Sequence, residues 1–92
     1  MLRIRFANRM KRDVKLMKKR GKNLSKLESI LEKLALRENL PVKNRDHQLA
    51  GEMQGFRECH IESDWLLIYR IEEDELILYA TATGSHADLF DM

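Results

Sequence analysis

Three strand-like segments in the C-terminal half constrain the fold of this chain more than any other feature. The segments are FRECHI (56–61), WLLIYRI (65–71) and ELILYAT (75–81), and each is rich in the aliphatic and aromatic residues that favour β-strands. The links between them, ESD and EED, are polar and have the length that joins antiparallel neighbours. The sequence therefore predicts an antiparallel three-stranded meander.

The N-terminal half predicts one more strand and a helical hairpin. Residues 2–6, LRIRF, alternate apolar and basic side chains, which indicates a half-buried strand. Apolar side chains then recur at helical spacing through residues 8–19 and 25–37, and Ser25 and Glu28 have the spacing of a capping box. The predicted order is β-α-α-β-β-β, an α+β fold with the helical hairpin packed on one face of the sheet.

The length of the chain limits how many domains it can form. With 92 residues, a single domain spanning residues 1–92 has a core near the lower limit for independent folding. The last residues, TGSHADLFDM, follow the meander, and Ser85 is placed to cap a short C-terminal helical turn. We therefore expect one domain that ends in this turn.

The sequence contains no sign of a membrane span or of a secretory signal. No apolar run approaches the roughly 20 residues that cross a bilayer, and MLRIRFANRM lacks the apolar segment of a secretory signal. Cys59 is the only cysteine, which excludes an intramolecular disulfide and a cluster of thiolates around zinc. We expect a cytoplasmic protein in which Cys59 is a small buried residue.

Basic side chains are concentrated at the N-terminal end. Residues 1–26 carry eleven basic side chains and one acidic side chain, a net charge of +10, whereas the rest of the chain carries six basic and 14 acidic side chains, a net charge of −8. This asymmetry indicates a polyanionic partner such as a nucleic acid, although a solvated helix surface is the alternative. The lysines of the first predicted helix are Lys11, Lys15, Lys18 and Lys19.

The polar residues that fit a simple packing scheme least well are three histidines. His47 lies in the connection before the meander, His60 in its first strand and His86 just after its last strand. Each could be an ordinary surface or core histidine, but a folded meander would bring them together. Because side chains alternate along a strand, Glu58 and His60 point to the same face, and Asp64 follows at the exit of that strand.

Histidines beside a carboxylate suit the cleavage of RNA. The 2′-hydroxyl of RNA is its own nucleophile, so an enzyme needs a base, an acid and a cation for the phosphate charge. Histidine exchanges a proton near neutral pH, and Arg57 or Arg70 could supply the cation. Three histidines and an aspartate can also bind zinc or iron, but no HxH, HxxxH or HExxH spacing supports a metal site, and none is predicted.

Three blocks of sequence resemble a known family. DHQLAG (46–51), FRECHIESDWLLIY (56–69) and TGSHADLF (83–90) are similar, in this order and spacing, to the YafQ branch of the RelE/ParE toxin superfamily. The resemblance implies a RelE-like fold and an mRNA interferase, an endoribonuclease that enters the ribosomal A site and cuts messenger RNA without a metal or other cofactor. It also implies inhibition by a cognate antitoxin of the DinJ or RelB type, with contact to operator DNA only through the antitoxin complex.

The same resemblance implies the identity of the site residues. The catalytic pattern of the family falls on four positions, and two aromatic positions match as well, of which Phe90 is associated with the active site. Trp65 alternates with Leu67 and Tyr69 along a strand, so a core role is the alternative to stacking on a base. The matched catalytic residues are His47, His60, Asp64 and His86.

One position departs from the family pattern. Related toxins often carry an arginine on the last strand before the histidine motif, but this chain has YATAT at residues 79–83. Arg57 is the first candidate to replace that cation, and Arg70 or an N-terminal lysine comes next. Two other functions remain open: a ParE-like toxin that binds DNA gyrase without a nuclease site, and a non-enzymatic RNA-binding regulator.

Overall fold

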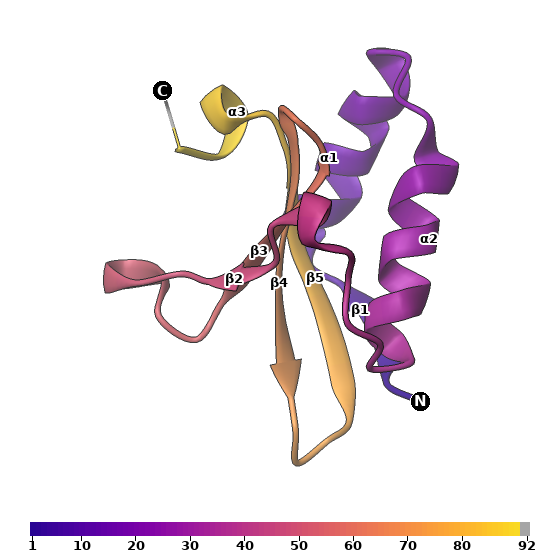
Figure 1. The fold of residues 1–92 in the computed structure, drawn as a ribbon. Helices are drawn as coiled ribbons and strands as arrows, with labels where there is room; N and C mark the ends of the chain where they lie inside the picture. The colour runs from indigo at the N-terminus through magenta and orange to yellow at the C-terminus, as the bar shows by residue number, and fades with distance from the viewer. Residues whose placement is uncertain (91–92) are drawn as a thin grey trace.

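Two helices cover one face of a five-stranded sheet in the computed structural model, which describes residues 1–90 (Figure 1). The strand β2 lies on the side of the sheet away from these two helices, and the short helix α3 follows the upper end of β5 (Figure 1). In chain order, with η for a 3₁₀-helix, the elements are β1 (Arg3–Phe6), α1 (Asn8–Lys19), α2 (Leu24–Ala35), η1 (Val42–Asn44), β2 (His47–Gln48), η2 (Gly51–Met53), β3 (Arg57–Glu62), β4 (Trp65–Glu72), β5 (Ile77–Gly84) and α3 (His86–Phe90).

The sheet contains the predicted meander together with two additional strands. The order across the sheet is β1-β5-β4-β3-β2, and β3, β4 and β5 are antiparallel neighbours, which confirms the meander and the α+β class. The first strand, β1, pairs parallel to β5, so the sheet is mixed. β2 was not predicted, because two residues are too few to show an alternating pattern. β5 begins later than predicted, since Leu76 adopts a left-handed conformation with φ of +56° in the preceding turn.

The helical hairpin is confirmed, with one correction at its second helix. Gly21 follows Arg20, the C-terminal cap of α1, and has a φ of +79°, which suits a glycine just past a helix end. α2 is capped by Asn23, whose side chain accepts a hydrogen bond from the backbone N–H of Ser25 at 3.1 Å. The capping box predicted at Ser25 and Glu28 is therefore wrong. Within residues 1–90, no helix is both long enough and apolar enough to cross a membrane.

The core lies between the two helices and the sheet. Cys59 is fully buried there, and burial raises the pKa of its thiol to about 12, so the expected role as an inert packing residue holds. Trp65 is also fully buried, and its indole N–H donates to the Thr83 hydroxyl at 2.9 Å. The prediction that Trp65 stacks on a substrate base is therefore wrong, since its ring is inaccessible. Other core residues are Met10, Met17, Leu27, Leu31, Leu34, Leu67, Tyr69 and Leu78.

Replacing Trp65 with alanine is expected to lower the free energy of unfolding by about 3–5 kcal/mol, because the lost ring leaves a cavity. Trp65→Phe keeps an aromatic ring but loses the hydrogen bond to Thr83, and we expect a smaller loss of about 1 kcal/mol from that bond. Urea denaturation measures both losses. A Trp65→Ala variant with normal stability and weakened RNA binding would contradict the core assignment.

Candidate active site

A row of ionisable side chains lies on the sheet face that points away from α1 and α2. In β3, Cys59 packs in the core, so its neighbours Glu58 and His60 face the other way. The register of β2 places His47 opposite Glu58. Glu58 is buried, and its Oε1 lies 3.7 Å from Nε2 of both His47 and His60. One carboxylate therefore lies between two of the predicted catalytic histidines.

The third histidine reaches this row from the end of β5. Leu66 in β4 pairs with His60 on one side and with Gly84 on the other, so the start of α3 lies near His60. The rings of His60 and His86 are 5.6 Å apart between centroids and meet edge to face. The row thus runs from His47 through Glu58 and His60 to His86.

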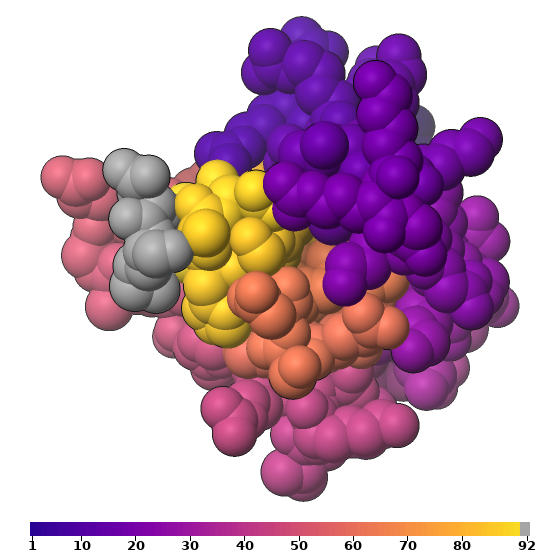
Figure 2. Space-filling view, turned by 90° about the horizontal axis from the view of Figure 1, so that it is seen from above, coloured from indigo at the N-terminus to yellow at the C-terminus, as the bar shows by residue number. Residues whose placement is uncertain are grey.

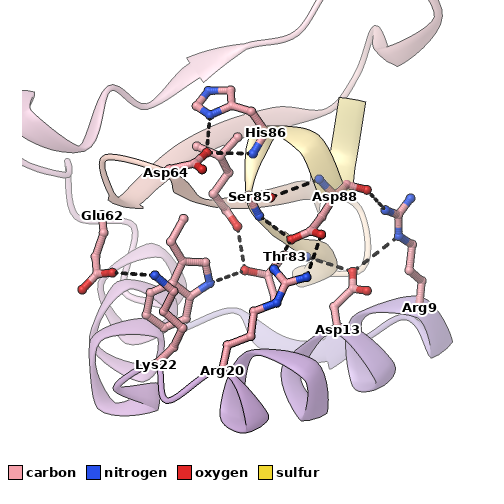
Figure 3. A network of polar contacts seen from close by, with 12 residues as sticks. Arg9, Asp13, Arg20, Lys22, Glu62, Asp64, Thr83, Ser85, His86 and Asp88 are labelled. Atoms are coloured by element: carbon pink, nitrogen blue, oxygen red, sulfur yellow. Dashed lines mark hydrogen bonds and ion pairs between the residues drawn. The ribbon is translucent and has the colours of Figure 1, made fainter. Parts of the chain in front are cut away.

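Asp64 fixes the orientation of His86. Its Oδ1 accepts the backbone N–H of His86 at 2.9 Å and lies 2.6 Å from the ring Nδ1 (Figure 3). These hydrogen bonds, the backbone one first, hold the pKa of Asp64 below its ordinary value. Because a carboxylate only accepts, Nδ1 carries the hydrogen, and in the neutral ring Nε2 is left to accept a proton. His47 has the same arrangement, with Nδ1 2.6 Å from the Arg45 carbonyl oxygen.

A pocket of about 460 Å³ opens beside His60 and His86, and two basic side chains line it. Lys43 and Arg45 come from η1 and the residue after it, and Arg45 has a left-handed φ of +47°. Asn44 anchors this segment, because it is buried and donates to the carbonyl oxygen of His60 at 2.7 Å. The remaining lining residues are Ile61, Glu62 and Ser63.

Arg57 does not supply the cation expected of it. It lies two residues before Cys59 and so points to the helix side of the sheet, opposite His60. Its guanidinium is 3.2 Å from the Tyr69 hydroxyl and 3.2 Å from Asp46. The prediction that Arg57 contacts the scissile phosphate is wrong.

Arg70 is also too far from His60 to contact the scissile phosphate. Leu66 pairs with His60, and Arg70 lies four residues further along β4, roughly 13 Å away at the rise of an extended strand. Its guanidinium pairs with Glu72 and lies over the ring of Tyr79, 4.6 Å from the centroid. Lys43 and Arg45 are the basic side chains at the histidine pocket itself.

The roles predicted for Phe90 and for the four lysines of α1 are not tested by the structure and stay predictions. Phe90 is half-buried and follows His86 by four residues on α3, a spacing that places both on one side of a helix. The lysines of α1 are exposed, and none of them forms an ion pair within residues 1–90. They are Lys11, Lys15, Lys18 and Lys19.

Comparison with known proteins identifies the family. The model of a family described as the bacterial toxin of type II toxin-antitoxin systems, YafQ, matches residues 2–91. The chain belongs to this family. The predicted resemblance to YafQ is thereby confirmed.

Relatives of known sequence and structure agree with this assignment. The mRNA interferase toxin YafQ of Escherichia coli K12 is 39% identical over 89 residues, which cover 95% of this chain and 94% of that protein. A metal-bound toxin from Helicobacter pylori has a TM-score of 0.93 at 38% identity, over 98% of this chain and 100% of that chain. The E. coli DinJ–YafQ complex matches with a TM-score of 0.88 at 35% identity, over 98% of this chain and 99% of that chain.

The donor groups of this YafQ family member do not fit a metal site. Among the residues that the structure describes, no three His, Cys, Asp or Glu side chains are grouped closely enough to hold a metal ion. In the histidine row the spacing is set by hydrogen bonds and by contact between rings instead. The bound metal is stated of the H. pylori toxin.

Sequence reasoning missed three residues of the site. Glu58 was placed on the same face as His60 but was not assigned a role, although its spacing along the strand identified it. Lys43 and Arg45 fall in a segment interpreted as a polar connection. Both residues precede His47 by only two to four positions, and this closeness in sequence could have indicated their place at the site.

Proposed function

We propose that the chain is an mRNA interferase, the toxin of a type II toxin–antitoxin pair that cuts messenger RNA. The observation that carries this proposal is the pair His60 and His86, whose rings meet edge to face with centroids 5.6 Å apart in one pocket beside Lys43 and Arg45. Two groups that exchange protons near neutral pH, placed next to positive charge, are what cleavage of RNA requires. Membership of the YafQ family and the name of the E. coli relative support the same activity.

The reaction uses the 2′-hydroxyl of the substrate as the nucleophile. One histidine takes the proton of the 2′-hydroxyl, whose oxygen attacks the adjacent phosphorus. The bond from phosphorus to the 5′-oxygen breaks, and a second histidine protonates that oxygen. The products are a 2′,3′-cyclic phosphate and a 5′-hydroxyl end, and Lys43 and Arg45 balance the charge that develops on the phosphate.

Hydrogen bonds prepare the histidines for this exchange. Asp64 holds Nδ1 of His86, and the Arg45 carbonyl oxygen holds Nδ1 of His47, so each neutral ring presents Nε2 for a proton. Glu58 lies within 3.7 Å of Nε2 of both His47 and His60 and stabilises a positive charge on either ring. The proposed catalytic set is His47, His60, Asp64 and His86.

The partners follow from the proposed activity. The E. coli YafQ structure with DinJ supports a cognate antitoxin of that type, through which the complex would contact operator DNA. The substrate is messenger RNA in the ribosomal A site, in the cytoplasm, and the lysines of α1 contact ribosomal RNA by their positive charge. Phe90, on the same helix as His86, contacts the RNA base.

Adding the purified protein to translating ribosomes is expected to produce discrete new 5′ ends in the messenger, which primer extension maps. The new ends should carry a hydroxyl group, because the 5′-oxygen leaves as an alcohol. Cleavage should persist after chelation under conditions that keep the ribosomes intact, since the proposed groups all belong to the protein and the RNA.

Three results would contradict the proposal. An intact messenger with inhibited DNA gyrase would indicate a ParE-like toxin. An intact messenger bound by the protein would indicate a non-enzymatic regulator. Recovery of a chelator-silenced enzyme by zinc or manganese alone would indicate a metal-dependent reaction.

A further inference from the structure

The helix that carries His86 is attached to α1 by an ion pair. Arg20, the residue that caps the C-terminal end of α1, donates to Asp88 from both Nη atoms, at 2.6 and 3.0 Å (Figure 3). Such two-point contacts between a guanidinium and a carboxylate fix orientation as well as distance. The two residues are therefore held in a defined geometry although they come from opposite ends of the sequence.

The same carboxylate also caps α3. Asp88 accepts the backbone N–H of Ser85 at 2.8 Å, and its own N–H donates to the Ser85 hydroxyl at 3.1 Å. The turn before the helix packs tightly, because a Cβ added at Gly84 would lie 2.8 Å from the Cβ of Asp88. With five residues, α3 is far too short to be stable by itself, so these contacts determine its position.

Two further contacts join α1 to α3 and to the end of β5. Arg9 donates to the carbonyl oxygen of Asp88 at 3.3 Å, and Asp13 accepts the backbone N–H of Thr83 at 3.1 Å. Figure 2 shows the yellow residues of α3 lying between the purple N-terminal helices and the orange β3–β4 turn. Arg9 and Arg20 therefore bind α3, although they lie within the basic N-terminal segment, residues 1–26.

We propose that Arg20 and Asp88 are positioning residues, which hold α3 so that His86 meets both Asp64 and His60. The proposal rests on the catalytic role proposed above for His86. His86 is the first residue of α3, and Asp88 lies two residues later. A shift of α3 changes the place of the His86 ring, and a misplacement of about 1 Å can lower a rate by about 10²-fold.

The charge state of the pair agrees with a permanent attachment. The hydrogen bonds from Arg20 first, and then the backbone N–H of Ser85, hold the pKa of Asp88 far below its ordinary value. The same hydrogen bond raises the pKa of Arg20. Both groups therefore remain charged around neutral pH.

Asp88→Asn and Arg20→Gln test the proposal separately. Asparagine keeps an oxygen that accepts the Ser85 N–H but loses the charge, and glutamine removes the guanidinium. We expect each variant to lower kcat for messenger cleavage by about 10- to 100-fold, with KM for ribosomes changed by less than about twofold. If the residues act as a pair, the double variant is no slower than the slower single variant.

Two further variants serve as comparisons. Glu73→Gln removes a carboxylate that also pairs with an arginine, Arg37, but lies in the turn between β4 and β5. That turn is at the opposite end of the sheet from α3 (Figure 1). The Glu73→Gln variant should therefore cleave messenger RNA at the normal rate. Arg20→Lys keeps the charge without the two-point contact and should have an intermediate kcat.

The possible outcomes distinguish failure of the positioning role from failure of the proposed active site. Normal kcat in Arg20→Gln and Asp88→Asn, together with an inactive His86→Gln variant, overturns the positioning role and leaves the proposed function standing. Normal cleavage by His86→Gln overturns the proposed site itself. A raised KM at unchanged kcat also overturns the positioning role, because Arg20 would then be a ribosome contact. If Arg20→Gln or Asp88→Asn is too unstable to assay, Arg20→Lys takes its place. A lowered kcat of Arg20→Lys then supports the positioning role, and a normal kcat overturns it.

Discussion

His60→Ala and His86→Ala are each expected to lower the rate of messenger cleavage by about 10²- to 10⁴-fold, the usual contribution of a general acid or base. The two rings meet in one pocket, and His86 has Nδ1 held by Asp64, so each substitution removes a proton-exchanging group without replacing it. Neither side chain belongs to the apolar core, so the fold should remain intact.

Cleavage rates on translating ribosomes and growth arrest after induced expression measure this effect. Circular dichroism and thermal melting establish that each variant is folded. Gln54→Ala, at an exposed position before β3, serves as the matched control and should remain as toxic as the wild type. If both folded histidine variants still arrest growth almost normally, the catalytic assignment is wrong.

Changing Lys11, Lys15, Lys18 and Lys19 together to glutamine is expected to weaken ribosome binding and reduce its dependence on salt. Each phosphate contact that is lost should lower the salt slope by roughly 0.7 to 0.9, so four lost contacts lower it by about 3. The site of cleavage should not change, because contacts to phosphate position a protein without reading sequence.

Ribosome affinity measured across a salt titration tests this prediction, and the His86→Ala variant is its control. His86 lies in the pocket rather than on α1, so that variant should bind with the normal salt slope. An acidic antitoxin that uses the same surface would also inhibit the quadruple variant less well. Unaltered affinity at every salt concentration would mean that these lysines form only a solvated helix surface.

Local patterns predicted much of the fold, and longer-range pairing explains what they missed. Apolar spacing predicted the meander and both bounds of α1. The alternation in LRIRF identified β1 as a strand, but alternation carries no information about which neighbour a strand chooses or in which direction. The start of β5 was predicted too early because Leu76 is apolar but lies in a turn with positive φ.

The site was predictable where it depended on strand geometry. Alternation along β3 placed Glu58 and His60 together, and the same rule, applied to Arg57 and Cys59, would have excluded Arg57 from the site. Arg45 could not be predicted in this way. Its place at the pocket depends on a left-handed backbone conformation, which few residues other than glycine adopt readily.

The parallel pairing of β1 with β5 determines when during synthesis this protein becomes complete. Arg3 pairs with Ile77, and the ion pair between Arg20 and Asp88 joins the first helix to the last. Contacts so distant in sequence form late in folding, because the intervening chain must first be ordered. The first strand therefore has no partner until β5, residues 77–84, has been synthesised. The sheet of this toxin can therefore close only once β5 has emerged from the ribosome.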